Sequence, residues 1–387
     1  MASPSRFIDD GRARVTHGDR VDRLAPYLMR TDPLADAAVA AFDEMPPGAG
    51  FEQVQRAIAH GIDAIPAAHP AIAALLRAVE RVPPWVDWGA LDRGGELLLR
   101  SGTFGGIVLG VQSLPYGYAS PAGNKPLAFS GRLKEQAPRR LSETARFVHA
   151  VCMPSGLRRG ADGYAACVKV RVMHAQVRRL LWESGRWQRE KWGEPINQHD
   201  MVATTLLFSA VVLDGLRKLG FRIRAAEAQR YIQLWRYVGW LLGTELELLP
   251  ATEAEALKLG DLIMRTQGKP DDDSRALTKA LFLAGPRGAR NDKERKRAER
   301  MAPVAIALSR SLLGAELADG LGIERTRLVH LVPLLRGVVR LVDSVRASIQ
   351  IFDAVALSIG SHYWTEVVER GLGDQPAEFA PPRALQV

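Results

Sequence analysis

The chain has 387 residues, of which 47% are hydrophobic, 25% charged and 7% aromatic. This composition is typical of a folded globular protein, so intrinsically disordered and fibrous classes are excluded. The 52 basic and 43 acidic residues give a net charge of +9, which is spread along the chain. A dedicated nucleic-acid binder concentrates its basic residues more strongly, so we expect no nucleic-acid partner.

The N-terminal residues and the longest apolar run bear on membranes and export. The longest uncharged run, residues 201–213, is too short to cross a bilayer, so we expect no membrane span. The first ten residues lack the apolar core of a secretory signal.

The chain has two cysteines, Cys152 and Cys167. Two are too few for a disulfide framework or a four-cysteine metal site. Their apolar neighbours indicate that both are small core residues.

The spacing of apolar residues predicts helices along almost the whole chain. They recur every three or four residues, alternating strand patterns are scarce, and no repeat of fixed period appears. The fold class is therefore all-α, as a single large helical domain with additional peripheral helices. In chain order, helices are expected over 33–45, 51–65, 71–81, 91–100, 140–151, 163–183, 200–219, 225–242, 252–265, 272–283, 302–313 and 328–359.

Proline and glycine clusters predict where these helices break. They lie at residues 83–84, 115–126, 153–156, 193–195 and 285–290, and none is long enough for a flexible interdomain linker. We expect an N-terminal extension over 1–30, one helical domain over 31–365 and a proline-containing tail over 366–387. We also expect the protein to be a monomer.

Two unusual segments have simple interpretations. Pro286–Arg300 holds seven basic and three acidic residues, which is typical of a solvated helix entrance or loop; docking on an acidic surface is the alternative. Ser101–Gly110 is rich in glycine without a phosphate-binding pattern. Its small residues indicate a helix that closely approaches either a neighbouring helix or a flat ligand.

A histidine lies in the apolar stripe of one expected helix. His174 shares a helical face with Cys167, Val170, Val177 and Leu181. Such a histidine is either a core residue with satisfied hydrogen bonds or a neutral imidazole placed to ligate a haem iron.

The preceding helix carries an arginine on an apolar face. Arg140, Thr144, Phe147 and Val151 follow one another at steps of four, three and four residues. Because arginine cannot lose its charge, it needs an anion or acceptor there. The partner is either a structural carboxylate, a haem carboxylate or a polar distal pocket.

Six strings in the same order resemble the latex clearing proteins, also called rubber oxygenases, over roughly residues 30 to 365. The strings are Pro84–Trp88, Arg140 with Thr144, Met173–Arg178, Trp192–Met201, Leu213–Arg217 and Leu234–Gly243.

The resemblance implies a globin-like core that binds one haem b, with dioxygen as co-substrate. The implied dioxygenase reaction cleaves the carbon–carbon double bonds of poly(cis-1,4-isoprene), giving oligo-isoprenoids with aldehyde and ketone ends. His174 corresponds to the proximal ligand of the haem iron, and Arg140 and Thr144 correspond to the pair beside the haem. Since this polymer is insoluble and extracellular, the resemblance also implies secretion. The absence of a Cys-x-x-Cys-His attachment sequence agrees with haem b.

The chain departs from the family at two positions. Members can carry a lysine three residues after the arginine, where this chain has Glu143, a candidate for proton abstraction. A carboxylate proposed as the base lies about sixteen residues before that arginine, and the corresponding position here is near Asn124. Because of these differences, the alternative is a haem-containing oxygenase or sensor of the wider family with another apolar substrate.

Two further interpretations do not involve haem. His199-Asp200, with His149 and Asp214, has the residue types of a helical metal-dependent phosphohydrolase. Alternatively, Asn197 caps the following helix and Asp200 faces its dipole.

A cluster of tryptophans suggests a binding module. Trp182, Trp187 and Trp192 alternate with Arg186, Arg189 and Lys191, as in surfaces that stack nucleic-acid bases. A turn between two helices, with its aromatic side chains packed on the core, explains the same pattern.

Overall fold

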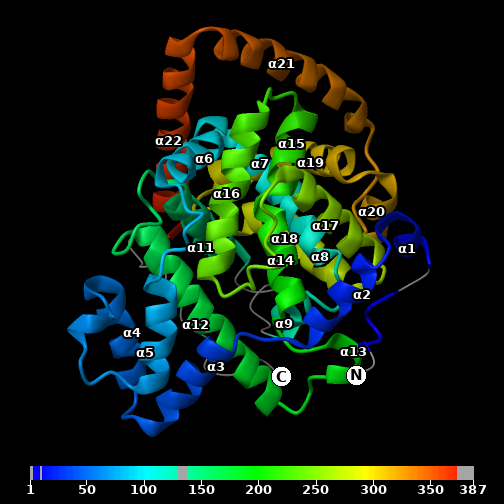
Figure 1. Ribbon diagram of the computed structural model, residues 1–387. Coiled ribbons are helices and arrows are strands. Elements are labelled where there is room, and N and C mark those ends of the chain that lie inside the picture. Colours follow the sequence, from blue (N-terminus) through cyan, green and yellow to red (C-terminus); the bar gives the residue numbers. More distant parts are fainter. Residues whose placement is uncertain (1–2, 9–10, 130–136, 373–387) are drawn as a thin grey trace.

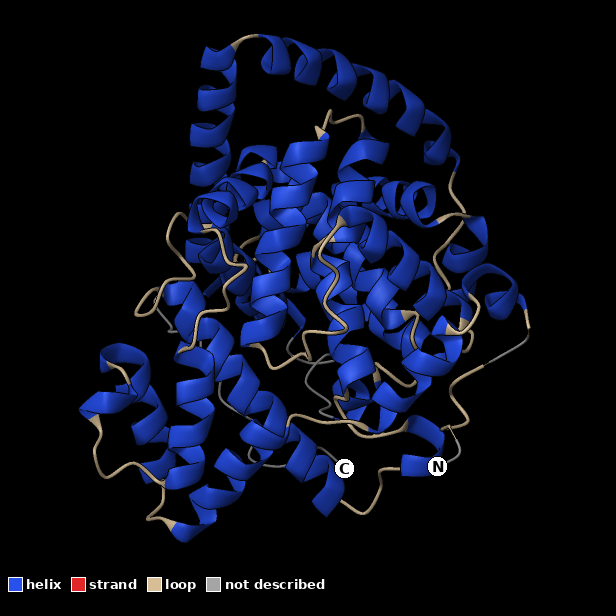
Figure 2. Ribbon diagram, viewed as in Figure 1, coloured by secondary structure: helices blue, strands red, loops and turns tan. Residues whose placement is uncertain are grey.

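The computed structural model describes residues 3–8, 11–129 and 137–372, and this part of the chain is helical without strands (Figure 2). The all-α prediction is therefore confirmed. The longer helices follow the expected ranges closely. The elements are α1 (Arg12–His17), α2 (Arg20–Leu24), η1 (Ala25–Met29), α3 (Pro33–Ala40), η2 (Ala41–Glu44), α4 (Ala49–His60), η3 (Ile62–Ala64), α5 (Pro70–Glu80), α6 (Trp88–Ser101), α7 (Thr103–Val108), the π-helical turn η4 (Leu109–Ser113), α8 (Leu114–Tyr118), α9 (Lys125–Phe129), α11 (Ala137–Cys152), α12 (Asp162–Glu183), α13 (Arg189–Trp192), α14 (Gln198–Phe208), α15 (Ala210–Leu219), α16 (Ala225–Leu241), α17 (Glu253–Arg265), α18 (Asp272–Arg287), α19 (Asp292–Leu313), α20 (Ala315–Gly320), η5 (Arg327–Leu331), α21 (Val332–Ser348) and α22 (Gln350–Leu372).

One predicted helix is divided in two at Ser209. The single helix expected over 200–219 is wrong, because Ser209 leaves helical geometry with φ −110° and ψ −89° between α14 and α15. The Ser209 hydroxyl donates to the Thr205 carbonyl at 2.8 Å, and the Tyr231 hydroxyl donates to the Phe208 carbonyl at 2.8 Å. Side-chain hydroxyls thus bond to carbonyls that would otherwise accept from backbone amides of a continuous helix. The spacing of apolar residues does not reveal such bonds.

A second long helix bends sharply at Ile349. The chain is extended there, with φ −132° and ψ 112°, so the helix expected over 328–359 becomes α21 and α22. Arg346 pairs with Asp343 at 2.7 Å on one side of the bend and with Asp353 on the other. Figure 1 shows α21 crossing the top of the molecule before α22 descends along its side.

Two predicted breaks are present but shorter than expected. Of the break expected over 115–126, residues 119–124 lie outside helices, whereas Pro115 lies in the first turn of α8, where its missing N–H does little harm. Near residue 290, α18 extends to Arg287, and α19 begins at Asp292, ten residues before the expected start. The Asn291 side chain caps α19 by accepting from the Glu294 amide at 2.9 Å. The basic segment therefore forms an exposed helix entrance, as the simpler interpretation expected.

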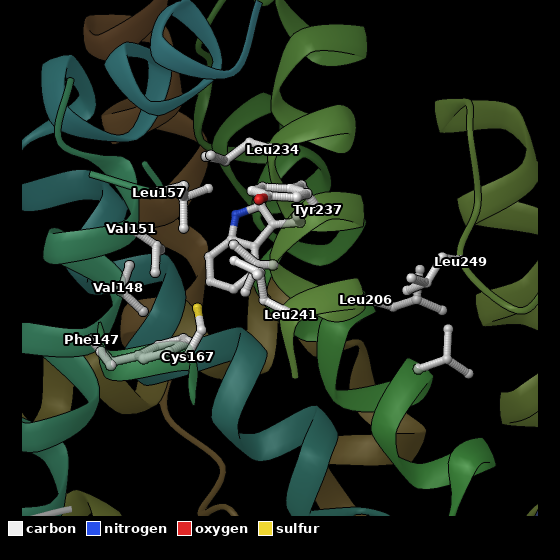
Figure 3. Packing of buried hydrophobic residues seen from close by; sticks show 14 of the residues in the cluster. Phe147, Val148, Val151, Leu157, Cys167, Leu206, Leu234, Tyr237, Leu241 and Leu249 are labelled. Carbon is white, nitrogen blue, oxygen red and sulfur yellow. The ribbon is translucent and has the colours of Figure 1, made fainter. Parts of the chain in front are cut away.

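The centre of the fold is formed by α6, α11, α12 and α16, with α22 packed on α6 and α11 (Figure 1). Figure 3 shows Phe147, Val148 and Val151 of α11 in the same buried cluster as Cys167 of α12 and Tyr237 of α16. Cys152 and Cys167 are buried and free, so their assignment to the core is confirmed. Burial raises the pKa of both thiols, which keeps them protonated.

Glycines allow helix backbones to touch in this core. A Cβ on Gly94 would lie 2.5 Å from the Arg230 carbonyl oxygen of α16, and one on Gly95 would lie 2.1 Å from the Cys152 carbonyl oxygen of α11. The glycine-rich run behaves similarly, since Gly106 faces the Tyr363 hydroxyl of α22. Close approach to a neighbouring helix therefore explains these glycines.

The N-terminal thirty residues pack on the helical body over the positions that are described. Val21, Leu24 and Leu28 are buried in the core, and Arg6 forms a two-bond ion pair with Asp200 at 2.7 and 2.8 Å. At the other end, α22 extends to Leu372. The remainder of the predicted tail lies outside the described residues.

No helix in the described ranges is by itself long and apolar enough to cross a membrane. Taken together, α6 and the stretch Thr103–Tyr118 meet the length and composition test as a pair, but they are bent by 88° at the junction.

The contact at Gly95 predicts a large effect of one methyl group. We expect Gly95→Ala to lower the free energy of unfolding by about 3 kcal/mol, because the Cys152 backbone must move. Urea unfolding followed by circular dichroism measures this effect. Gly110→Ala is the matched control, since nothing lies within 4 Å of its Cβ position. Equal stabilities for the two variants would contradict the close packing.

Candidate functional site

The site is built on two neighbouring helices, α11 and α12, which pack against each other. His174 lies in the middle of α12, on the face that also carries the buried Cys167 and Leu181. Arg140 and Thr144 lie on α11, on the face that also carries Phe147. The structure therefore brings both sequence-predicted helix faces into one region.

His174 is held as a neutral imidazole. Burial lowers its pKa to about 4, and the positive charges of Arg178 and Arg140 lower it as well, while Asp32 acts in the opposite direction. The ring nitrogen Nδ1 is buried and, among the described residues, has no hydrogen-bond partner. The sequence offered His174 as a core residue with satisfied hydrogen bonds. For its Nδ1 this interpretation is wrong within the described residues. A neutral ring with an unused buried nitrogen suits metal ligation.

Two buried ion pairs position the helix turns on either side of His174. Arg171 pairs with Asp32 through two bonds of 2.6 and 2.9 Å, one turn before the histidine. Arg178, one turn after it, pairs with Asp36 of α3. Burial raises the pKa of Asp36, and the neighbouring guanidinium opposes that shift. These contacts join α12 to the start of α3 (Figure 1).

Arg178 also connects α12 to the segment that precedes α14. Its Nε donates to the Pro195 carbonyl and its Nη2 to the Ile196 carbonyl, both at 3.0 Å. The sequence analysis did not select Asp32, Asp36 or Arg171. The spacing of the two arginines around His174 is visible in the sequence, but the aspartates lie about 140 residues away and only the fold reveals them.

The charge of Arg140 acts on groups of both α12 and α8. It lowers the pKa of His174 and also opposes the effect of burial on Tyr118, whose pKa rises to about 12. Tyr118 was not selected from the sequence, and its phenol is buried. The region therefore combines a fixed cation, a neutral imidazole and a phenol that stays protonated.

Thr144 and Glu143 make local contacts on α11. The Thr144 hydroxyl donates to the Arg140 carbonyl at 2.9 Å, so it is fixed on its own helix. Glu143 accepts from Arg139 Nε at 3.2 Å, one turn earlier, and its side chain is partly exposed. Glu143 is therefore available to solvent and is ion-paired.

Asn124 is fully buried. Its amide nitrogen donates to the Tyr118 carbonyl at 2.9 Å and to the Ser274 hydroxyl at 3.1 Å. Its Oδ1 is buried without a partner among the described residues. The side chain thus joins α8 to α18 beside Tyr118.

Aromatic side chains continue the apolar wall on the α11 side. Phe147 lies 6.4 Å from Trp235 between ring centroids, and Trp235 stacks on Phe208 at 5.0 Å. The indole nitrogen of Trp235 is buried without a hydrogen-bond partner in the described part of the chain. These rings form an apolar aromatic cluster next to α11.

The metal-site interpretation around His199 and Asp200 is wrong. Asp200 is engaged by Arg6, which keeps the pKa of its carboxyl well below the usual range, and Asp214 pairs with Lys218 at 2.7 Å. Across residues 3–8, 11–129 and 137–372, no group of three or more histidine, cysteine or acidic side chains is arranged to hold a metal ion. Instead, the Asn197 side chain caps α14 by accepting from the Asp200 amide at 2.9 Å.

The tryptophan segment packs on the protein rather than forming an open stacking surface. Trp187 is buried, donates to the Gly193 carbonyl at 2.8 Å and meets Trp192 edge-on at 5.1 Å. Trp192 also lies against Phe129, and Arg189 lies over Trp182. These contacts confirm the interpretation as a turn between helices.

A half-open groove of about 1050 Å³ lies on another part of the molecule. Its lining includes Tyr116, Leu207, Asp261 and Met264, but neither His174 nor Arg140. The groove is therefore separate from the α11–α12 region. We place the candidate site in the α11–α12 region because of its side-chain chemistry.

Residues 97–344 match the sequence profile of the family described as "ER-bound oxygenase mpaB/B'/Rubber oxygenase, catalytic domain". The chain belongs to this family. The matched region contains Arg140, Glu143, Thr144 and His174. A rubber oxygenase from Streptomyces sp. (strain K30) is 27% identical over 247 residues, which are 63% of this chain and 58% of that protein.

The fold is also similar to that of a solved structure. The latex clearing protein LCP in its closed state aligns with a TM-score of 0.69 and 21% identity, and the alignment covers 95% of each chain. At this level of identity the likeness establishes the shared helical fold.

The neutral state of His174 predicts a pH dependence of stability. An unfolded histidine takes up its proton near pH 6.5, while the folded one does so near pH 4. The unfolded state thus binds more protons between these values, so stability falls as the pH decreases through this window, by about 3 kcal/mol from this residue. Urea unfolding of the haem-free protein between pH 4 and pH 7 measures this loss of stability. The His174→Gln variant should lose less stability than the wild type over this range, because it lacks the contribution of His174.

The control is His330→Gln, because His330 is exposed. It should retain the wild-type pH dependence. If His174→Gln showed the same decline as the wild type, the ring would not be held neutral by burial.

Proposed function

We propose that this protein is a haem b-dependent dioxygenase that cleaves the double bonds of poly(cis-1,4-isoprene). The observation that carries the proposal is the neutral imidazole of His174 on α12, whose Nδ1 is buried and has no hydrogen-bond partner among the described residues. Membership of an oxygenase family supports the reaction class. The match to a rubber oxygenase supports the substrate.

The residues of the site fit haem b through complementary contacts. His174 would ligate the iron, and its neutral state means that no proton must leave before it binds. Phe147 and Trp235 would border the apolar macrocycle. Arg140 would place its positive charge near a haem carboxylate. When bound, the haem supplies the binding and activation of dioxygen.

The chain itself would orient the polymer and exclude water. Tyr118 and Asn124 are buried and joined to each other, since the Asn124 amide donates to the Tyr118 carbonyl at 2.9 Å. An isoprenoid segment is uncharged and would bind by burial of apolar area. Each cleaved double bond consumes one dioxygen molecule and gives one aldehyde end and one ketone end, so both oxygen atoms enter the products.

Thr144 and Glu143 would have different roles on α11. The Thr144 hydroxyl is held by the Arg140 carbonyl, so its oxygen has a fixed position beside the arginine. Glu143 replaces a lysine that members of the family can carry, and it would accept a proton from the substrate during cleavage. Its side chain accepts from Arg139 Nε at 3.2 Å, which holds the carboxyl group against α11.

Activity on this polymer also leads to a proposal about location. Rubber is too large to enter a cell, so the protein would act after export. Cell fractionation of the native host, followed by detection of the protein in the culture medium, tests this.

The first test concerns the cofactor. Wild-type protein produced with ample haem should show a Soret band and about one haem b per chain by the pyridine haemochromogen assay. His174→Ala should lose the band. His149→Ala is the matched control, since His149 also has a buried ring nitrogen without a partner in the described chain but lies on α11. Haem that persists in His174→Ala would refute the ligand assignment.

The second test concerns Glu143. We expect Glu143→Gln to keep its haem and to lower oxygen uptake with polyisoprene by about 100-fold, as loss of a general base does. Glu183→Gln is the control, because that glutamate pairs with Arg179 at the end of α12. Unchanged turnover of Glu143→Gln would exclude the base. Haem binding by the wild type without oxygen uptake on the polymer would indicate a sensor or another apolar substrate.

A further inference from the structure

Exposed apolar side chains gather on α21 and the start of α22. Half of the large hydrophobic residues that are exposed within the described ranges lie between residues 331 and 359. Figure 1 shows that these two helices stand at the edge of the molecule, with α21 crossing its top. The residues are Leu331, Leu334, Val338, Leu341, Val342, Val345, Ile349, Ile351, Phe352, Val355 and Ile359.

The exposed residues of α21, together with Leu331 at the end of η5, follow a regular spacing. Leu331, Leu334, Val338, Leu341 and Val345 succeed one another at steps of three, four, three and four residues, and we call them the α21 seam. Leu334 and Leu341 are each 69% exposed. Steps of three and four place the five side chains in one narrow row along the helix.

The opposite side of α21 already contacts the protein. Val332, Val339 and Asp343 are buried there, and Asp343 accepts a hydrogen bond from the Arg222 amide at 2.6 Å. The helix therefore has one apolar side that it uses internally and a second apolar row that faces outward. Internal packing explains the first row but not the second.

The composition of the seam fits another helix of the same kind. Valine at positions 338 and 345 alternates with leucine at 334 and 341, the arrangement that favours pairs of helices in coiled coils. The positions that flank the seam are Leu335, Gly337, Val342 and Ser344, which carry no charge. Two copies of α21 can thus approach each other without repulsion between like charges.

We propose that the α21 seam binds the α21 seam of a second copy of this chain, giving a symmetric dimer. The eleven exposed side chains of the seam, its flank and the start of α22 together offer on the order of 1,000 Å² of apolar surface, of which the five seam residues contribute about half. A standard interface takes about 800 Å² from each partner, so the start of α22 takes part in the contact beside the seam. A monomer rarely leaves so much apolar surface in water. A symmetric contact needs only one self-complementary surface, which the seam provides. This proposal replaces the expectation of a monomer and is independent of the haem chemistry.

Sedimentation velocity and light scattering on the full-length protein test the proposal. Between about 1 and 100 µM, the wild type should reach twice the chain mass of 42.4 kDa. Val338→Glu and Leu341→Glu place a charge in the middle of the seam, so each should weaken the dimer by at least about tenfold. Both positions are exposed, so circular dichroism and thermal unfolding of the isolated chains should stay close to those of the wild type.

Leu257→Glu is the matched control, because Leu257 is 50% exposed on α17, away from the seam. It should dimerise as the wild type does. A wild type that remains monomeric over the whole range would overturn the proposal, as would dimers that survive both seam substitutions. Monomeric wild type that sediments with phosphatidylglycerol vesicles would also overturn it, because a lipid surface would then be the partner of the seam.

Discussion

Two arginines on one face of α12 hold the centre of this protein in place. Arg171 and Arg178 lie one turn before and one turn after His174, and both are buried against aspartates from the beginning of α3. A buried charge is tolerated only when it is paired and hydrogen-bonded, so these contacts allow little freedom of position. The histidine between them is therefore placed by its neighbours, since its Nδ1 has no hydrogen-bond partner among the described residues.

The same charges set the chemistry of the site. Burial and the nearby guanidinium groups keep His174 neutral, and a neutral ring is the form that can ligate a metal. Arg140 adds a cation from α11 whose charge acts on both His174 and Tyr118. In the proposed complex, this positive charge would favour the carboxylates of a haem.

The arrangement of α11 depends on backbone contacts as much as on side chains. Gly95 lets α6 lie against the carbonyl of Cys152, so α11 can sit close to the centre of the fold. On its other side, α22 packs along α11, and Gly371 lies against Ser142 near the beginning of the site. The helix α22, whose first residues expose apolar side chains, thus packs directly on α11, which carries Arg140 and Thr144.

Much of this architecture could be read from the sequence because helices depend on local information. The apolar period predicted α11 and α12 to within a few residues, and it placed His174 and Arg140 on inward faces. The cap at Asn197 was also readable, since a cap bonds to a residue three positions away. The order of six short strings was enough to indicate the family that the profile match then established.

Only the tertiary structure decided which distant groups meet. The partners of Arg171 and Arg178 lie about 140 residues away, and neither the breaks at Ser209 and Ile349 nor the outward apolar row of α21 follow from local periodicity. An apolar stripe predicts that a helix has a face to bury, and it does not say against what. The physical reason is that periodicity records the conformation of one helix, whereas ion pairs, bends and exposed surfaces result from how several helices pack.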